Sequence, residues 1–511
     1  MRRFLPRPTL AAAATFSVGI ALIPLAYLGV RVGEAGWARI TDELITARTG
    51  ALVVRSVALA AVVTAACTVL GVVLAFLVTR TDVPARRLFG VLAALPLAVP
   101  SYVAAFVWVS TVDGFEGFWA AALVLTLVSY PYVYLPVTAA LTGVDPAQEE
   151  VSRSLGRGPW RTAGGVTLRQ VRPAVAAGAL LVALYVLSDF GAVSIVRVDV
   201  LTRAVFTSIN LGFDRTGALV LATVLVALTA VVLLAEQLTR RRGARYARVG
   251  GGAPRPPTRL RLGALRWPAA LAFTGVIATA LGVPAASLLR RSLEGVSRPG
   301  SIAELATAAR NSLGVALLGT ALTVLLALPV GLLTTRVPGR LAVALDRLTY
   351  LSHALPGLVI GLSLVFFGIN VAYPLYQSVW LLALAYAALF LPLAVAAVGS
   401  AVAQAPPGLE EVARSLGRRR SYVLRTVTVP LAAPGIGAGA ALVFLTCMKE
   451  LPATLLLRPT RLDTLATELW TQTSVAAYAA AAPYAALLVL IAALPTWWLS
   501  ARTGVPTRGG G

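Results

Sequence analysis

Twelve apolar runs, each about 20 residues long and so able to cross the ~30 Å hydrocarbon core of a bilayer as a helix, restrict the fold of this chain more than any other feature. Hydrophobic residues make up 58% of the 511 residues and charged residues 13%, whereas soluble domains have roughly 25% charged residues. The sequence therefore predicts an all-α polytopic membrane protein. The runs cover approximately residues 10–30, 54–78, 88–111, 118–141, 173–195, 216–238, 267–289, 311–335, 341–369, 377–402, 434–456 and 476–500.

The net charge of +23 is distributed unevenly between these runs. If the N-terminus lies inside and the chain crosses twelve times, most arginines fall on the inside, nine of them in residues 239–266. This pattern follows the positive-inside rule and predicts a multi-pass protein of the cell membrane with both termini in the cytoplasm. Membrane lipid headgroups suffice as partners for the charge, so nucleic acid is not expected. The first run lacks a clear cleavage site, which favours an uncleaved helix over a signal peptide.

One nine-residue phrase occurs twice: residues 149–157 read EEVSRSLGR and residues 410–418 read EEVARSLGR. Each half of the chain contains one copy of this phrase and six of the apolar runs. Because an even number of crossings returns the chain to its starting side, we expect two parallel six-helix repeats. The predicted domains are a first transmembrane half at 1–238, a basic Gly/Pro/Arg cytoplasmic linker at 239–266, and a second transmembrane half at 267–511. Further matched residues are Ser56 and Ser312, Thr79–Arg80 and Thr335–Arg336, Leu135–Pro136 and Leu391–Pro392, and Pro173 and Pro434.

Each repeated phrase predicts a short helix. In the first copy Asp145 can cap its start and Pro146 can occupy the first turn, and Gly156 can adopt the left-handed conformation that ends a helix. Val151 and Leu155 are four residues apart and therefore share a face. An interfacial helix lying on lipid headgroups is one interpretation. The recurrence of two acidic residues in both copies favours instead a protein partner with two equivalent grooves.

The two loops resemble the EAA loops of permeases from bacterial binding-protein-dependent ABC importers, although Val151–Ser152 and Val412–Ala413 depart from that motif. The resemblance extends over essentially the whole chain and implies a type I ABC importer transmembrane-domain fold. It implies two cytoplasmic ABC ATPase subunits and an extracytoplasmic solute-binding protein as partners. In that family the loop forms a coupling helix that inserts into a cleft of each ATPase. By this resemblance, the ATPase-coupling residues would be Glu149, Glu150, Gly156, Glu410, Glu411 and Gly417.

The sequence contains no catalytic pattern. A Walker A motif requires a lysine after glycine, and Lys449, the only lysine, is followed by Glu450. Cys67 and Cys447 lie in separate apolar runs and indicate neither a disulfide framework nor a metal site. We therefore expect no enzyme, no cofactor and no resident metal, with ATP hydrolysis on a separate partner subunit. An ion-coupled secondary transporter is the alternative.

Three charged residues are expected within the membrane: Asp189, Lys449 and Glu450. Asp189 and Glu450 occupy matched positions, each 16 residues beyond a matched proline and thus about 24 Å along the helix. Ionisable groups in membrane helices usually line a pathway or pair with one another, so the hypothesis is a translocation pathway near its outer gate. Because Gly191 and Pro452 follow them, they could instead pair structurally or cap broken helices.

The substrate is indicated only by resemblance. The segments KELPATLLLRP (449–459), DTLATELW (463–470) and SDFGAV (188–193) are similar to those of the iron(III) branch of fused permeases. Carboxylates also suit a hard trivalent ion. Thiamine and polyamine permeases look alike in these segments, so both remain alternative substrates.

Overall fold

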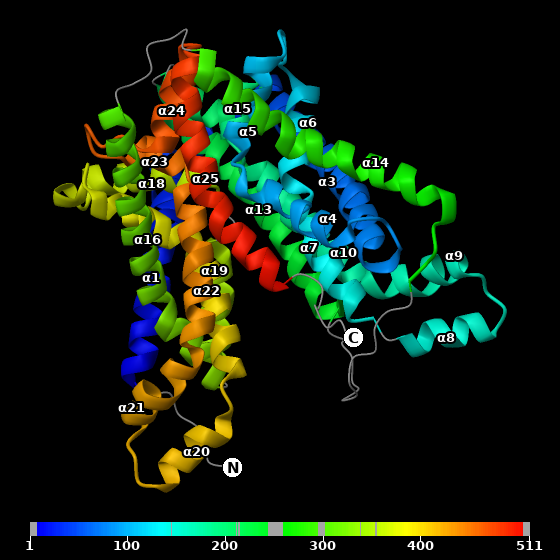
Figure 1. Ribbon diagram of the computed structural model, residues 1–511. Coiled ribbons are helices and arrows are strands. Elements are labelled where there is room, and N and C mark those ends of the chain that lie inside the picture. Colours follow the sequence, from blue (N-terminus) through cyan, green and yellow to red (C-terminus); the bar gives the residue numbers. More distant parts are fainter. Residues whose placement is uncertain are drawn as a thin grey trace. The chain divides into compact units, whose positions relative to one another are not determined.

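The computed structural model describes residues 8–144, 146–210, 212, 215–243, 259–294, 302–337, 339–352 and 355–503. In these residues the regular structure is helical (Figure 1), apart from one isolated bridge between Thr81 and Leu260. Nine helices of the described chain are long and apolar enough to cross a bilayer, or eleven if each of two bent helix pairs counts as one span. The predicted all-α polytopic class is confirmed.

The nine continuous helices coincide with nine of the predicted apolar runs. The runs at 88–111 and 341–369 are not single helices, because each is a pair bent by 93° or 98°. The helices after the breaks begin directly behind Pro100 and Pro356. Proline disfavours the helical conformation in the residue before it, and Val99, which precedes Pro100, is accordingly extended. The last run forms α25 (Tyr478–Thr503).

The chain divides into two compact units, which are described separately. The first-half unit comprises residues 45–207, 227–299 and 472–511. Its membrane core is α3, α7 and α10, which pack on one another. Its helices and helical turns are α3 (Ala47–Arg80), α4 (Arg86–Leu92), η1 (Leu95–Ala98), α5 (Ser101–Thr111), α6 (Phe118–Ser129), α7 (Pro131–Thr142), α8 (Pro146–Ser154), α9 (Pro159–Thr162), η2 (Ala163–Thr167), α10 (Leu168–Ser188), α11 (Gly191–Ile195), η4 (Gly263–Leu265), α14 (Arg266–Ile277), η5 (Ala278–Gly282), α15 (Val283–Glu294) and α25.

The second-half unit comprises residues 1–44, 208–226 and 300–471. Its core is α16, α19 and α22, again packed on one another. Three further helices, α12 (Leu201–Asn210), α13 (Arg215–Gly243) and α24 (Leu465–Ser474), run from one unit into the other. The remaining elements are α1 (Pro8–Ala35), α2 (Trp37–Leu44), α16 (Ile302–Arg336), α17 (Arg340–Ser352), α18 (Gly357–Asn370), η6 (Tyr373–Leu375), α19 (Val379–Gln404), α20 (Pro407–Ser415), α21 (Arg420–Val423), η7 (Leu424–Thr428), α22 (Val429–Met448) and α23 (Pro452–Leu457).

Glycines bring the core helices of each unit close together. A Cβ on Gly178 of α10 would lie 2.8 Å from the Tyr132 carbonyl oxygen of α7. At the matched position in α22, a Cβ on Gly439 would lie 2.4 Å from the Cβ of Ala397 in α19. Small residues permit such backbone approach in a bilayer, where van der Waals contact rather than the hydrophobic effect associates the helices.

Each unit combines helices from both ends of the chain. The N-terminal helix α1 runs along α16 (Figure 1) and also packs on α17 and α18 of the second half. In the other unit α15, which follows α14 and η5 at the start of the second half, packs on α5 and α25, and Ser287 of α15 is hydrogen-bonded to Thr111 of α5 at 2.8 Å. Compact units and sequence repeats therefore have different boundaries in this chain.

Residues 244–258 of the predicted linker lie outside the described residues. Residues 239–243 form the end of α13. On the other side of that gap, the Leu260 amide donates to the Arg80 carbonyl at 2.7 Å, and the Leu262 amide donates to Asp82 Oδ1 at 2.8 Å. This part of the predicted linker is thus attached to the end of α3.

Candidate functional site

The repeated phrases form two short helices, α8 and α20, as predicted. Each is followed by a glycine in the left-handed conformation, Gly156 at φ 77° and Gly417 at φ 78°. The Gly156 amide donates to the Arg153 carbonyl at 2.9 Å, and the Gly417 amide to the Arg414 carbonyl at 3.0 Å. This geometry confirms the predicted glycine stops. Asp145, the predicted cap, lies outside the described residues.

One face of each short helix is apolar and exposed. Val151 and Leu155 of the first phrase have 58% and 75% of their surface exposed, and Val412 and Leu416 have 57% and 75%. Glu150 and Glu411 are exposed as well. Two helices far apart in the sequence therefore present nearly the same small surface, which we call the outer face.

The opposite face of α8 is anchored by Glu149, which is only 3% exposed. Its Oε1 lies 3.1 Å from Nη1 of Arg80, the last residue of α3. Thr167 Oγ1 donates to the same oxygen at 2.7 Å, and Arg80 Nη2 donates to the Leu141 carbonyl of α7 at 2.9 Å. One carboxylate thus joins α8 to the end of α3 and to the turn before α10.

The second half repeats this anchor. Arg336, at the end of α16, lies 2.8 Å from Glu410 Oε1, and Thr428 Oγ1 donates to that oxygen at 3.0 Å. Arg336 also donates to the Ala405 carbonyl at 2.9 Å. The second pair is less buried, with side-chain exposures of 21% and 23% against 3% and 4% for the first.

The structure thus separates the six residues assigned to coupling by resemblance. Glu150 and Glu411 lie exposed beside the outer faces, while Glu149 and Glu410 point inward and bind arginine. The arginines and threonines of the anchor were not singled out as functional. The signal for them was present, because Arg80 and Arg336 are matched in the repeat, as are Thr167 and Thr428.

The predicted helix breaks near the membrane carboxylates are confirmed. In one unit α10 ends at Ser188 and α11 begins at Gly191; in the other α22 ends at Met448 and α23 begins at Pro452. Asp189 Oδ1 accepts hydrogen bonds from the amides of Ala192 at 3.0 Å and Val193 at 3.3 Å. The Asp189 carboxylate therefore caps the start of the short helix α11.

Glu450 makes the corresponding cap, since its Oε1 accepts from the Ala453 amide at 3.0 Å. Lys449 precedes it, half-buried, at the end of α22. In the residues that the structure describes, no three His, Cys, Asp or Glu side chains gather as metal ligands would.

The partners of the two carboxylates differ at one matched position. Ser101 begins α5, and its hydroxyl donates to Asp189 Oδ2. The matched residue at the start of α18 is Gly357, where a Cβ would lie 2.6 Å from Glu450 Oε1. The first half thus pairs the shorter Asp189 with Ser101. At the matched positions of the second half, the longer Glu450 is paired with Gly357, which leaves room for it.

Comparison with known proteins identifies the family. The profile described as "Binding-protein-dependent transport system inner membrane component" matches the chain twice, at residues 67–243 and 324–501. The chain belongs to this family.

Among its relatives, the permease is 37% identical to the Fe(3+)-transport system permease protein FbpB 2 of Haemophilus influenzae, over 94% of this chain and 96% of that protein. The sulfate transport system permease protein CysT of Escherichia coli is 28% identical over 45% of this chain and 92% of its own length. The molybdenum transport system permease protein ModB of Mycobacterium tuberculosis is 33% identical over 39% of this chain and 81% of its own length. The protein is therefore a fused, two-half ABC importer permease of the inner membrane rather than an enzyme.

The unequal burial of the two anchors leads to a prediction about stability. Arg80→Met leaves the buried Glu149 carboxylate without its countercharge, which should cost about 3 kcal/mol, whereas Arg336→Met should cost about 1 kcal/mol. Thermal unfolding of the purified permease in detergent would measure both. Arg80→Met combined with Glu149→Leu should recover most of the loss, and equal destabilisation by the two single changes would contradict this account.

The glycine at the start of α18 leads to a second prediction. Gly357→Ser should lower the unfolding temperature, because its Cβ meets the Glu450 carboxylate. Adding Glu450→Asp shortens the acid and reproduces the Ser101–Asp189 pair, so the double variant should regain stability. Gly437→Ala is the control, because a Cβ there has no heavy atom within 4 Å. Additive losses in the double variant would show that the two positions are not complementary.

Proposed function

We propose that this permease forms the translocation pathway of an iron(III) importer and is driven by two cytoplasmic ATPase subunits that dock on α8 and α20. The observation that carries the proposal is the duplicated outer face, with Leu155 and Leu416 equally exposed in the two halves. An apolar stripe beside an acid on a short helix suits a groove on a partner protein. Two equivalent stripes suit two copies of one partner.

The residues assigned to coupling then have three roles. Glu150 and Glu411 meet the ATPases together with the apolar outer faces. Glu149 and Glu410 transmit the motion, because each joins its short helix to an arginine at the end of a long helix. Gly156 and Gly417 end the short helices and set the direction of the following chain. ATP-driven closure of the ATPase pair would shift the equilibrium between inward- and outward-facing states.

Asp189, Lys449 and Glu450 are proposed to lie along the translocation pathway. Their place at breaks between helices supports this, because irregular backbone is tolerated at membrane depth where it is buried in protein or lines a cavity. The caps show how the carboxylates can be structural at the same time. A pathway role for these carboxylates therefore requires that their negative charge affects transport separately from their capping of the short helices.

The iron(III) assignment comes from FbpB 2, the Haemophilus relative that matches nearly the full length of both chains. The sulfate and molybdenum relatives match less than half of this chain. Thiamine and polyamines remain alternative substrates. We further propose the domain boundaries 1–238, 239–266 and 267–511, an extracytoplasmic solute-binding protein as the donor of substrate, and cytoplasmic termini.

Transport in proteoliposomes tests the proposal. The permease, the ATPase and the solute-binding protein encoded beside it should import labelled iron(III) when ATP is enclosed with the ATPase. Sulfate, molybdate, thiamine and polyamines serve as competing substrates. Uptake that needs an ion gradient but no nucleotide would replace this proposal with an ion-coupled secondary transporter.

The outer faces predict a loss of coupling on charge insertion. The double variant Leu155→Asp with Leu416→Asp should reduce co-purification of the ATPase and ATP-dependent uptake by at least about tenfold, because each change puts a charge into an apolar contact. The matched control is Leu341→Asp with Val343→Asp, at residues of α17 that are 42% and 51% exposed and lie at the predicted cytoplasmic end of their run. Equal uptake by the two double variants would remove the docking role.

The charge of Asp189 can be separated from its capping role. Asp189→Asn keeps an oxygen that can cap α11 but removes the charge, so stability should hold while uptake falls. Asp189→Ala removes the cap as well and should also cost about 1 kcal/mol of stability. Unfolding temperature and initial uptake rate measure the two effects. Wild-type uptake by the Asn variant would assign Asp189 to structure alone.

A further inference from the structure

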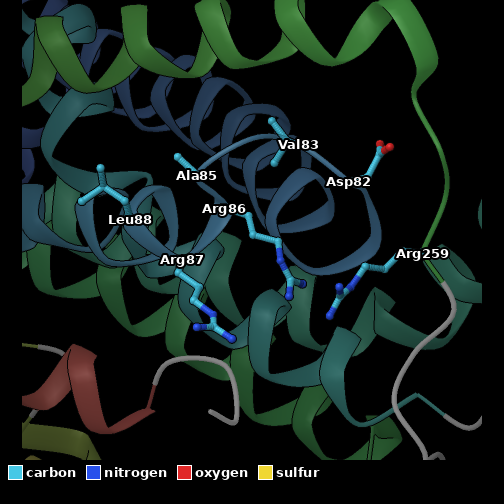
Figure 2. A pocket seen from close by; sticks show the side chains of 7 residues that line it. All are labelled: Asp82, Val83, Ala85, Arg86, Arg87, Leu88 and Arg259. Carbon is cyan, nitrogen blue, oxygen red and sulfur yellow. The ribbon is translucent and has the colours of Figure 1, made fainter. Parts of the chain in front are cut away.

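A basic pocket lies where the described part of the linker meets the loop after α3. It has a volume of about 570 Å³. Figure 2 shows the side chains of Arg86, Arg87 and Arg259 extending to one side of it, with the guanidinium groups of Arg86 and Arg259 close together. The lining residues are Asp82, Val83, Ala85, Arg86, Arg87, Leu88 and Arg259.

The charges of this pocket are not balanced within the described chain. Arg87 and Arg259 are both near enough to Arg86 to repel its charge, and in the described residues none of the three forms an ion pair. Asp82 is the one acidic residue of the lining, and its Oδ1 already accepts the Leu262 amide at 2.8 Å. Figure 2 shows its carboxylate directed away from the guanidinium groups. The pocket therefore carries a net positive charge, which an anion from outside the chain would neutralise.

We infer that this pocket binds a phosphate-bearing anion, with the three guanidinium groups as its ligands. Planar guanidinium groups bind phosphate oxygens through paired, charge-assisted hydrogen bonds. Leu88, next to Arg87, is 58% exposed and offers an apolar surface at the edge of the pocket. Phosphate beside apolar surface is the chemistry of an anionic phospholipid, and free phosphate offers the same oxygens without the chain.

The position of the pocket gives binding a structural consequence. Arg259 immediately precedes Leu260, whose amide binds the Arg80 carbonyl. The side chain of Arg80 in turn holds Glu149 of α8. An anion shared by Arg259 and the α4 arginines would therefore hold the linker against the end of α3, beside the anchor of the first short helix.

Binding to the full-length permease in nanodiscs of neutral phosphatidylcholine tests this inference. Labelled phosphatidylglycerol and inorganic phosphate are titrated separately. The pocket variants are Arg86→Gln with Arg87→Gln, and Arg259→Gln alone. The control, Arg340→Gln with Arg347→Gln, removes the same charge from exposed positions of α17. Unfolding temperature without ligand confirms that each variant folds.

We expect saturable binding to wild type and control, weakened on the order of tenfold in the double pocket variant and less in Arg259→Gln. If phosphatidylglycerol alone shows this dependence, the site holds a lipid headgroup. If inorganic phosphate shows it, the site holds the free anion. Affinities for both ligands that do not differ between the pocket variants and the control would overturn the inference.

Discussion

An ion pair between an arginine that ends a long helix and a glutamate in the first turn of a short one organises the exposed faces of α8 and α20 in this permease. Arg80 with Glu149, and Arg336 with Glu410, fix the rotation of α8 and α20. At 3.6 residues per turn, an inward glutamate directs the residues two and six positions later to the opposite side. Val151 and Leu155 are therefore exposed because Glu149 is buried. The same relation holds for Val412, Leu416 and Glu410.

The two halves meet the same requirements with different residues. The first anchor is nearly enclosed and the second is partly exposed. The first membrane carboxylate is aspartate beside serine, and the second is glutamate beside glycine. A duplicated chain keeps the interactions that its geometry needs while individual side chains change in compensating pairs. The basic pocket has no such repeat, because Arg259 belongs to the linker that joins the halves.

Much of this organisation could be predicted from the sequence, because apolar length, charge asymmetry and repetition are local signals. The spans, the short helices and their glycine stops were predicted from those signals alone. The bends at Pro100 and Pro356 were not, since each bent pair reads as one apolar run. The burial of Glu149 was not predicted either. Glu149 and Glu150 are adjacent and identical in type, and only the ion pair with Arg80, which is distant in the sequence, distinguishes them. The packing of α1 on α16 was not predicted either, because the sequence repeat assigns these two helices to different halves.

Site-directed cross-linking measures most directly whether the outer faces of α8 and α20 contact the ATPases. Cys67 and Cys447 are buried and can remain in place. Single variants Leu155→Cys and Leu416→Cys would be treated with a short thiol cross-linker in the assembled transporter, with Val343→Cys as the exposed control on the same predicted side of the membrane. We expect both positions, and not the control, to form a cross-link to an ATPase subunit. Failure of both positions to exceed the control in an assembly that imports substrate would contradict the account.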